Sequence, residues 1–344
     1  MRPYQPATAL LVSLMLAGCG NGEAPVAYEL SGSAMGTRYS VTIAEPLTAE
    51  QRQVLEGRID GTIDAVEQAM STYIVESDVS RFNASRSTDW IEVSDSVCHA
   101  VAAAHGLSEL TNGAFDITVG PLVNLWGFGP ETVELAPPPP EEIKAAQARV
   151  GYQRVHADCS RPAIRKDRAD VYIDLSAWAK GYAVDRVAVL LDDLGIENYL
   201  AEIGGELRMT GRNAEGKLWG IGIEKPSDNG RDIQMVIRLT DRAVSTSGDY
   251  RNYFVYEGQR YSHLIDGRKG APVSHNLASV TVVADETAFA DAMATALLVL
   301  GPDEGMELAV RENLAAYFQL RLDEGFAEKM SPAFEALVNG NSAM

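Results

Sequence analysis

The hydrophobic pattern of the chain changes character near Tyr199, and this change restricts the fold more than any other feature. Before that point, several long segments repeat apolar residues every three or four positions, as amphipathic helices do. From residue 199 to 283 the apolar segments are short and are separated by Gly, Asp, Asn and Pro, which is typical of antiparallel strands. No composition break divides the chain, so we expect an α+β fold with helices packed on a mostly antiparallel sheet.

The same pattern predicts the main elements and some of their boundaries. Helices are expected at residues 47–70, 96–110, 141–150, 179–194 and 288–300, and extended segments at 171–173, 218–223, 235–239, 253–256 and 278–283. Thr48 and Gln51 form a capping-box pattern at the start of the first helix, and Gly195 is placed to end the fourth. The run Pro137–Pro140 predicts a surface loop, because proline donates no backbone hydrogen bond.

The N-terminus resembles the signal of a bacterial lipoprotein. Arg2 precedes an apolar stretch that is too short to cross roughly 30 Å of hydrocarbon, and small residues then lead to Cys19. We expect Cys19 to carry a lipid that anchors the protein to an extracytoplasmic membrane face; Gly20, in place of Asp, favours the outer membrane if the cell has two. An ordinary cleaved signal with an incidental cysteine is the alternative. The expected division is a signal peptide at 1–18, a tether at 19–31 and one domain at 32–344.

Charge and cysteine content narrow the class of partner. The formal net charge is −19, which argues against nucleic acid or an anionic membrane surface as the main partner. A phosphate ligand would need local positive charge here, and a divalent cation is a compact source of it. Cys98 and Cys159 could form a disulfide in an oxidising compartment, but the sequence leaves their distance open.

Asp291 and Thr295 are a candidate metal site. They are four residues apart in an apolar helical segment, so both side chains project from one face of the helix. A carboxylate and a hydroxyl are oxygen ligands of the kind that Mg²⁺ prefers. The alternative is that Asp291 faces solvent and Thr295 bonds to its own helix, and the pair alone does not decide between the two.

A second candidate lies where a strand ending in Asp174 would lead into a helix that starts near Ser176. Free backbone N–H groups and the positive end of the helix dipole favour a phosphate at such a junction. Lys180 would neutralise the phosphate and the Ala177 carbonyl would reach a metal, although a helical lysine is more often merely solvated. The pair Gly204–Gly205 permits close backbone approach or a tight turn.

His263 and Asp266 are candidates for proton transfer, since an imidazole held by a carboxylate titrates near neutral pH; a lone histidine beside a strand is more often structural. Tyr73, Phe115 and Trp126 lie next to glycine or small residues and either sandwich a planar ligand or fill core. The sequence has no nucleophile elbow, no zinc-binding cluster and no dinucleotide-binding glycine motif, so these classes lack support.

Six ordered segments together resemble the ApbE family of FAD:protein FMN transferases, with a match that spans Gly32 to about Gly301. These segments are Gly32–Thr37, Ser71–Tyr73 with Ser80–Asn83, Gly113–Leu122, Asp174–Asp185, Ser245–Tyr253 and Ala290–Ala296. Two positions depart from the family: Gly267 follows Asp266 where proline is usual, and Trp178 replaces a smaller aliphatic residue.

The resemblance implies a Mg²⁺-dependent transfer of FMN from FAD to a threonine or serine hydroxyl of an acceptor protein, with release of AMP. The FAD site would be lined by Met35, Tyr73, Ala114, Phe115, Asp116, Asp174, Lys180 and Ile265. The metal would be held by the Ala177 carbonyl, Asp291 and Thr295, and Lys180 would act with His263 and Asp266 in catalysis. Acceptors of the family suggest extracytoplasmic redox proteins, such as subunits of NADH:quinone reductases. An FAD pyrophosphatase, a non-catalytic flavin-binding lipoprotein and a structural lipoprotein are the competing interpretations.

Overall fold

An antiparallel sheet of eight strands forms the centre of the protein, as seen in a computed structural model that describes residues 27–130, 135–227 and 232–341. Its strands, in spatial order, are β1 (Tyr28–Ala34), β2 (Thr37–Ile43), β6 (Tyr199–Ile203), β7 (Glu206–Thr210), β10 (Arg242–Gly248), β15 (Leu277–Ala284), β16 (Ala315–Arg321) and β17 (Phe326–Met330). Every neighbouring pair in this order is antiparallel. The predicted α+β class is therefore confirmed.

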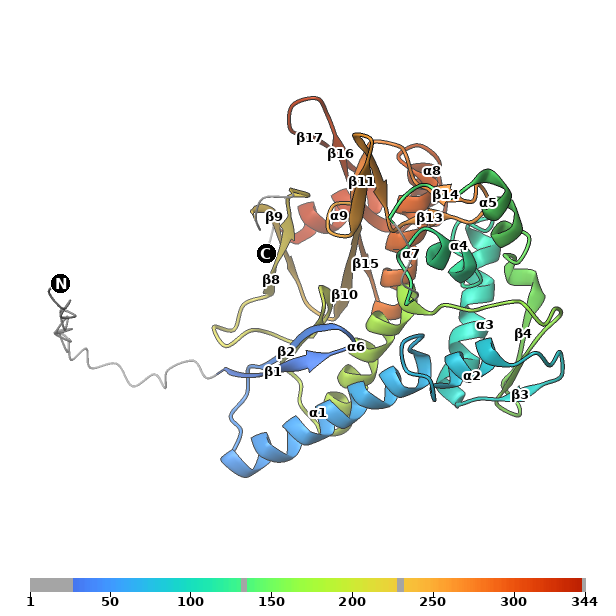
Figure 1. The fold of residues 1–344 in the computed structure, drawn as a ribbon. Helices are drawn as coiled ribbons and strands as arrows, with labels where there is room; N and C mark the ends of the chain where they lie inside the picture. Colours follow the sequence, from blue (N-terminus) through green and yellow to red (C-terminus); the bar gives the residue numbers. More distant parts are fainter. Residues whose placement is uncertain (1–26, 131–134, 228–231, 342–344) are drawn as a thin grey trace, which may run out of the picture.

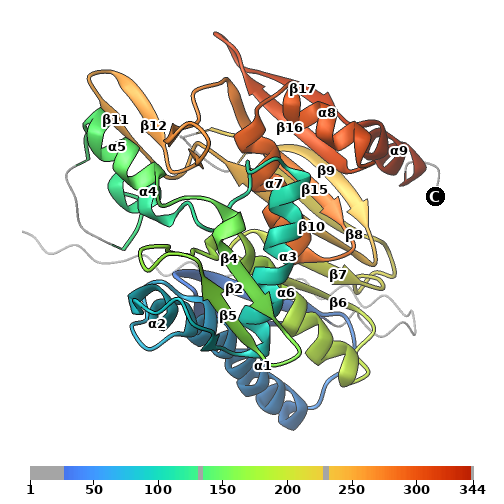
Figure 2. The same ribbon diagram turned by 90° about the vertical axis from the view of Figure 1, so that its right-hand side faces the viewer.

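Helices cover one face of this sheet. Helices α6 (Ser176–Asp193) and α7 (Thr287–Leu300) lie against the central strands, and α1 (Ala49–Met70) packs on α6 (Figures 1 and 2). Helix α3 (Asp95–Leu110) lies beyond them and also contacts α1. The apolar faces of these helices and of the sheet form one large buried core, which fixes α6 and α7 rigidly over the middle of the sheet.

The other face of the sheet is partly covered by the hairpin of β8 (Trp219–Glu224) and β9 (Ile233–Leu239) and by helix α9 (Pro332–Asn341). A second buried cluster joins these elements to the central strands, and includes Met209, Trp219, Ile221, Ile237, Val244, Tyr317 and Phe334. The hairpin pairs within itself and does not belong to the eight-stranded sheet.

The remaining elements lie around the helical layer (Figure 2). The strands are β3 (Ile91–Glu92), β4 (Val155–Asp158), β5 (Ala163–Lys166), β11 (Tyr253–Tyr256), β12 (Gln259–Ser262), β13 (Ile265–Asp266) and β14 (Ala271–Pro272). The helices are α2 (Asp78–Ala84), α4 (Gly120–Leu125), α5 (Pro140–Gln147), η1 (Tyr152–Arg154) and α8 (Glu304–Arg311). A third apolar cluster packs α4 and α5 against the β11–β12 hairpin.

Local sequence signals account for several boundaries. The capping box is formed: Thr48 Oγ1 accepts from the Gln51 N–H at 3.1 Å, and Gln51 Oε1 accepts from the Thr48 N–H at 2.8 Å. The proline run is a loop only as far as Pro139, because Pro140 is the first residue of α5. Proline suits that position, since the N–H it lacks would have no helical partner.

Two expectations about extended chain are wrong. Residues 171–175 form no strand. The Asn83 side chain takes the place of a partner strand, donating to the Ile173 carbonyl and accepting from its N–H, both at 2.8 Å. At the N-terminus, β1 begins at Tyr28, so residues 28–31 belong to the sheet and not to the tether predicted over 19–31. The signal peptide 1–18, Cys19 and the rest of the tether to residue 26 lie outside the described residues.

The open question about the cysteines is answered by the structure. Cys98 of α3 and Cys159 of the β4–β5 turn form a disulfide, with their Cα atoms 5.7 Å apart. Strands β3, β5 and β4 form a small sheet of three strands, and the bond ties this sheet to the helical layer. Among the helices described, none is long and apolar enough to cross a bilayer.

Candidate active site

Helices α6 and α7 meet at Gly181, and this contact sets the geometry of the site. A Cβ atom at position 181 would lie 2.5 Å from the Thr287 carbonyl oxygen, so no other residue fits at this crossing without displacement. The close approach lets the Gly181 N–H donate to Asp291 Oδ2 at 3.2 Å. Asp291 is therefore held by the backbone of the neighbouring helix.

Asp291 and Thr295 lie on one face of α7, as their spacing predicts. The Asp291 side chain is nearly inaccessible, with 3 % of its residue surface exposed. The Thr295 hydroxyl lies 2.9 Å from the Ser247 hydroxyl at the end of β10, so it faces the sheet rather than its own helix. Both side chains line the same cavity, and the alternative of a solvent-facing Asp291 is excluded.

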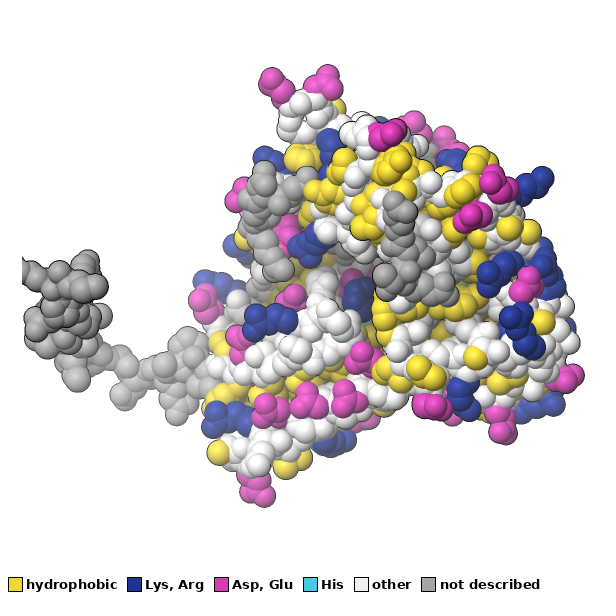
Figure 3. All heavy atoms as spheres, in the orientation of Figure 1, with side chains coloured by type: hydrophobic (Ala, Val, Ile, Leu, Met, Phe, Trp, Pro, Cys, Tyr) yellow, Lys and Arg dark blue, Asp and Glu magenta, His cyan; other side chains and the backbone are white. Residues whose placement is uncertain are grey.

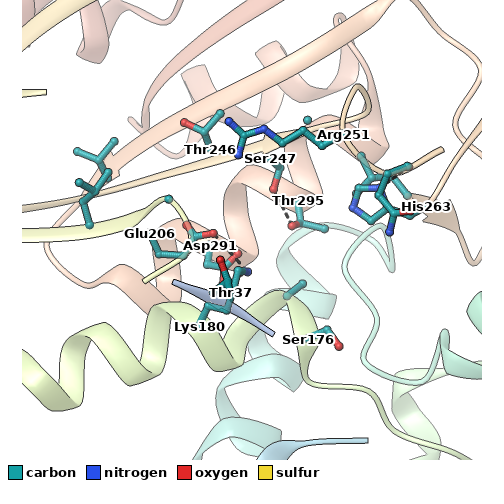
Figure 4. Close-up of a pocket in the computed structure, with 18 of the residues that line it drawn as sticks. Thr37, Ser176, Lys180, Glu206, Thr246, Ser247, Arg251, His263, Asp291 and Thr295 are labelled. Carbon is teal, nitrogen blue, oxygen red and sulfur yellow. Dashed lines mark hydrogen bonds and ion pairs between the residues drawn. The ribbon is translucent and has the colours of Figure 1, made fainter. Parts of the chain in front are cut away.

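Two further charged groups, Lys180 and Glu206, converge on Asp291 (Figure 4). Lys180 Nζ of α6 lies 3.3 Å from Glu206 Oε1 of β7 and 3.6 Å from Asp291 Oδ2 of α7. Burial opposes the lysine charge, but the two carboxylates outweigh it and raise the pKa of Lys180. Burial and the nearby Asp291 raise the pKa of Glu206 to about 7, against the opposing effect of Lys180. Lys180 is thus a fixed positive charge between two acidic groups.

The structure leaves oxygen atoms available for a cation at this point. Ala177 has non-helical backbone angles, and the Gly181 N–H, four residues further along α6, donates to Asp291. Glu206 Oε2 is buried without a hydrogen-bond partner among the described residues. A carboxylate, a hydroxyl and a backbone carbonyl suit Mg²⁺. The described residues contain no cluster of three His, Cys, Asp or Glu side chains for a metal.

Glu206 was not singled out in the sequence, although the residues before it were. Gly204 and Gly205 have φ angles of +61° and +97° and form the tight turn between β6 and β7. A Cβ atom on Gly204 would lie 2.8 Å from Thr37 and 3.4 Å from Lys180. The turn therefore lets β7 approach α6 closely enough for Glu206 to reach Lys180. The glycine pair was the feature of the sequence that could have pointed to Glu206.

These groups lie in a cavity of about 1090 Å³, and the molecule is visibly hollowed near the middle of the face in Figure 3. The cavity is lined by most of the residues expected to bind FAD, namely Tyr73, Ala114, Phe115, Asp116, Asp174, Lys180 and Ile265, and by the metal-site residues Ala177, Asp291 and Thr295. Met35 is the exception: it occupies the β1–β2 turn with a φ of +52°, and its N–H donates to Glu67 at 3.0 Å.

The predicted pair of His263 and Asp266 is wrong. The Asp266 carboxylate is bound by the Arg268 guanidinium, with two contacts of 2.9 Å, and does not line the cavity. His263 does line it, but its Nδ1 lies 3.0 Å from the Asn252 carbonyl oxygen. Burial is the main cause that lowers the pKa of His263. The imidazole is therefore oriented by a backbone carbonyl, not by a carboxylate.

The aromatic candidates separate into two groups. Tyr73 and Phe115 line the cavity, Tyr73 with an exposed fraction of 68 %. Trp126 instead lies in the buried cluster under α4, where its Nε1 donates to the Gly270 carbonyl at 3.1 Å. Trp178 is buried in the main core and does not line the cavity, so its departure from the family pattern leaves the cavity wall unchanged.

Comparison with known proteins identifies the family. The ApbE family model matches residues 35–318. The chain is 42 % identical over 335 residues to the FAD:protein FMN transferase of Haemophilus influenzae, covering 96 % of each protein, and 39 % identical over 337 residues to that of Escherichia coli, also covering 96 % of each.

Solved structures give the same result. The flavin transferase ApbE from Vibrio cholerae superposes with a TM-score of 0.84 and 40 % identity, covering 91 % of this chain and 99 % of that one. The flavinyl transferase ApbE from Pseudomonas stutzeri, in its apo form, also gives a TM-score of 0.84 at 40 % identity, covering 91 % and 97 %. By family model, sequence identity and fold, the chain belongs to the ApbE family.

Proposed function

We propose that the protein is an FAD:protein FMN transferase, which moves FMN from FAD to a threonine or serine hydroxyl of an acceptor protein and releases AMP. The observation that carries the proposal is the placement of Lys180 between the buried carboxylates of Glu206 and Asp291, at the wall of a cavity that also contains the expected FAD-binding residues. The curated relatives of nearly the same length bear the name of this activity.

Mg²⁺ is the metal that the donor set favours. Asp291, Thr295 and the Ala177 carbonyl would hold it. The Glu206 carboxylate would not be a ligand in this arrangement; it forms an ion pair with Lys180 beside the metal. When bound, the metal would neutralise charge on the substrate pyrophosphate. This matters in a protein of net charge −19, because its field repels a polyanionic ligand.

The residues of the chain mainly position and neutralise during the reaction. Lys180 would hold the pyrophosphate and absorb negative charge as the acceptor hydroxyl forms a bond to the phosphorus on the FMN side and the bond to AMP breaks. The hydroxyl proton must leave at the same time. His263 is suited to take it. Its Nδ1–H is donated to the Asn252 carbonyl, and no described residue makes a hydrogen bond to Nε2, which can therefore accept the proton. Burial lowers the pKa of the ring and so favours its neutral form.

The location of the protein is part of the proposal. Removal of residues 1–18 and lipidation of Cys19 would anchor the domain to a bacterial membrane, with the active site outside the cytoplasm. The Cys98–Cys159 disulfide supports an oxidising compartment. The acceptor would then be an extracytoplasmic redox protein.

The test is to incubate the purified domain with FAD, Mg²⁺ and the extracytoplasmic domain of an NADH:quinone reductase subunit, with and without EDTA. Flavin fluorescence of the acceptor on a denaturing gel, together with AMP release, is the expected result, and EDTA should abolish both. Release of AMP and free FMN without labelled protein would favour an FAD pyrophosphatase. FAD that stays intact in the presence of Mg²⁺ would favour a flavin-binding protein.

A further inference from the structure

Strand β8 has a backbone edge that borders the active-site cavity. Five consecutive residues of β8, Gly220 to Glu224, line the cavity, whereas no described residue of β9 does. Side chains alternate between the two faces of a strand, so a consecutive run lines a cavity through its backbone edge. Within the described residues, β8 pairs with β9 alone. The edge of β8 that faces away from β9 is therefore open to the cavity.

This edge is held firmly and is not obstructed by side chains. Ile221 and Ile223 are buried against the central sheet and fix the position of β8. The alternate positions, Gly220 and Gly222, carry no side chain and have ordinary negative φ angles. The backbone of β8 is accordingly exposed at Gly220 and Gly222, and an uncovered strand edge is a template for another strand.

The neighbouring strands provide a floor beside this edge. On β6, Ala201 and Ile203 point into the helical core, while Leu200 and Glu202 point to the opposite face and line the cavity. Ser40 of β2, which pairs with Glu202, lines the cavity on the same face. An extended segment beside β8 would thus lie over an uncovered part of the central sheet.

The end of β8 connects this floor to the catalytic groups. Glu224, the last residue of β8, is ion-paired with Arg251. Arg251 and Ser247 both line the cavity, and the Ser247 hydroxyl contacts Thr295 (Figure 4). None of the residues expected to bind FAD belongs to β2, β6 or β8. The cavity, at about 1090 Å³, also exceeds the roughly 300–1,000 Å³ of a typical small-molecule site, which leaves room for a second occupant.

We propose that the acceptor polypeptide docks in extended form on the free edge of β8 and adds a third strand to the β8–β9 hairpin. Backbone hydrogen bonds would hold the segment, as in other cases of strand addition. They would position its threonine or serine in the cavity near Asp291, Thr295 and Lys180. This mode suits an enzyme whose acceptors share a short segment rather than a fold. The inference rests on the proposed function, because it requires a polypeptide acceptor.

Proline substitution at successive positions of β8 tests this docking mode. In an antiparallel pair, alternate residues direct their N–H toward the partner strand and the others direct it to the open edge. Because the Lys225 N–H donates to the Asp232 carbonyl of the β9 side, the N–H groups of Ile223 and Ile221 also face β9, and those of Gly222 and Gly220 face the open edge. Among Gly220→Pro, Ile221→Pro, Gly222→Pro and Ile223→Pro, the two glycine variants should therefore keep the melting temperature and the KM for FAD. They should raise the KM for the quinone-reductase domain about fivefold or more, because each loses a hydrogen bond to the acceptor.

The matched control is Glu328→Pro on β17, which is also an edge strand but does not line the cavity. The Ser331 N–H donates to the Ala316 carbonyl, so the alternate position 328 directs its N–H away from β16. This variant should leave the KM for the acceptor unchanged. Should all four β8 variants unfold, amide hydrogen exchange of wild-type β8 decides: saturating acceptor should slow exchange across residues 219–224, and unchanged exchange overturns the docking mode.

The two proposals fail in different ways. Folded proline variants that keep the wild-type KM for the acceptor would overturn docking on β8 and leave FMN transfer intact. Failure of the wild-type enzyme to label any acceptor, with FAD cleaved or unchanged, would overturn the proposed function itself.

Discussion

Asp185 of α6 caps the N-terminus of α7 by accepting the Thr287 N–H at 2.9 Å with Oδ1. Its Oδ2 accepts the Ala288 N–H, also at 2.9 Å, and Arg208 donates to Oδ1 at 2.8 Å. The residue at the usual capping position, Glu286, makes no side-chain capping bond. Because Asp291 lies one turn further along α7, this cap also fixes the register of Asp291 against Lys180.

Replacement of that cap should weaken both the fold and the site. We expect Asp185→Ala to lower the free energy of unfolding by roughly 1–2 kcal/mol, since two helix N–H groups lose their acceptor. The Mg²⁺ concentration for half-maximal transfer should rise, because α7 is no longer locked to α6. Urea denaturation and a Mg²⁺ titration measure the two effects. Asp193→Ala, an exposed change at the C-terminal end of α6, is the control, and equal stability of the two variants would contradict the capping role.

The same glycine-to-alanine change should have opposite effects on protein stability at two helical positions. Gly57→Ala on α1 meets no atom within 4 Å, so it should raise the free energy of unfolding by up to about 1 kcal/mol through helix propensity. Gly181→Ala should lower it by roughly 1–3 kcal/mol, because the new Cβ meets the backbone of α7 at Thr287. Thermal and urea denaturation of both variants check the sign, and a stabilised Gly181→Ala protein would show that the crossing tolerates a side chain.

Elements with local signals were predictable from the sequence. The capping box at Thr48 and the apolar repeat behind it place α1 within two residues of its observed start. The segment 171–173 was predicted as extended chain in a strand because its residues favour strands, but its hydrogen-bond partner is a side chain 90 residues away, Asn83. No propensity encodes such a partner, because only the packing of α2 brings it near.

The site was predictable in its chemistry and less so in its contacts. The spacing of Asp291 and Thr295 placed both on one helix face, since helical periodicity is a local property. Glu206 was missed, because its meeting with Lys180 depends on how β7 packs against α6. Asp266 was assigned to His263, but a residue two positions further, Arg268, binds it bidentately and leaves the imidazole to a backbone carbonyl.

Loss of the Asp291 carboxylate should abolish metal-dependent transfer. We expect Asp291→Ala to reduce transfer by roughly 100-fold or more at any Mg²⁺ concentration, because a metal and its ligands supply several kcal/mol of transition-state stabilisation. EDTA should have no further effect on this variant, whereas it should abolish wild-type activity. Asp285→Ala, which removes an exposed carboxylate just before α7, is the matched control. Full activity of Asp291→Ala would refute the metal site.

The pH dependence of transfer should report His263 and be independent of Asp266. A base must be deprotonated to act, so kcat/KM should rise with pH through a midpoint below 6.5, the direction in which burial moves the pKa of His263. His263→Gln should remove this limb and lower the rate by roughly 10²–10⁴-fold. Asp266→Asn should keep it, since Asp266 does not contact the ring. A limb that survives in His263→Gln would assign the base to another group.

Lys166 should make the stability of the protein depend on pH in the alkaline range. Its buried Nζ donates to the carbonyls of Phe82 and Val171, at 2.9 and 3.1 Å, and no described carboxylate makes an ion pair with it. Burial is the main cause that lowers its pKa from 10.5 to about 8.

Between these two values the unfolded chain binds more protons than the folded protein, so the lysine's contribution to stability becomes more favourable as pH rises from about 8 to 10.5. Below pH 8 both states are protonated and the contribution is constant. Lys166→Met removes the titrating group with little change of volume, so the stability of the wild type relative to this variant should rise between pH 8 and pH 10 and stay level between pH 6 and pH 7. Urea denaturation of both proteins at these pH values gives the difference directly, and parallel curves would show that Lys166 titrates normally because water reaches it beneath α2.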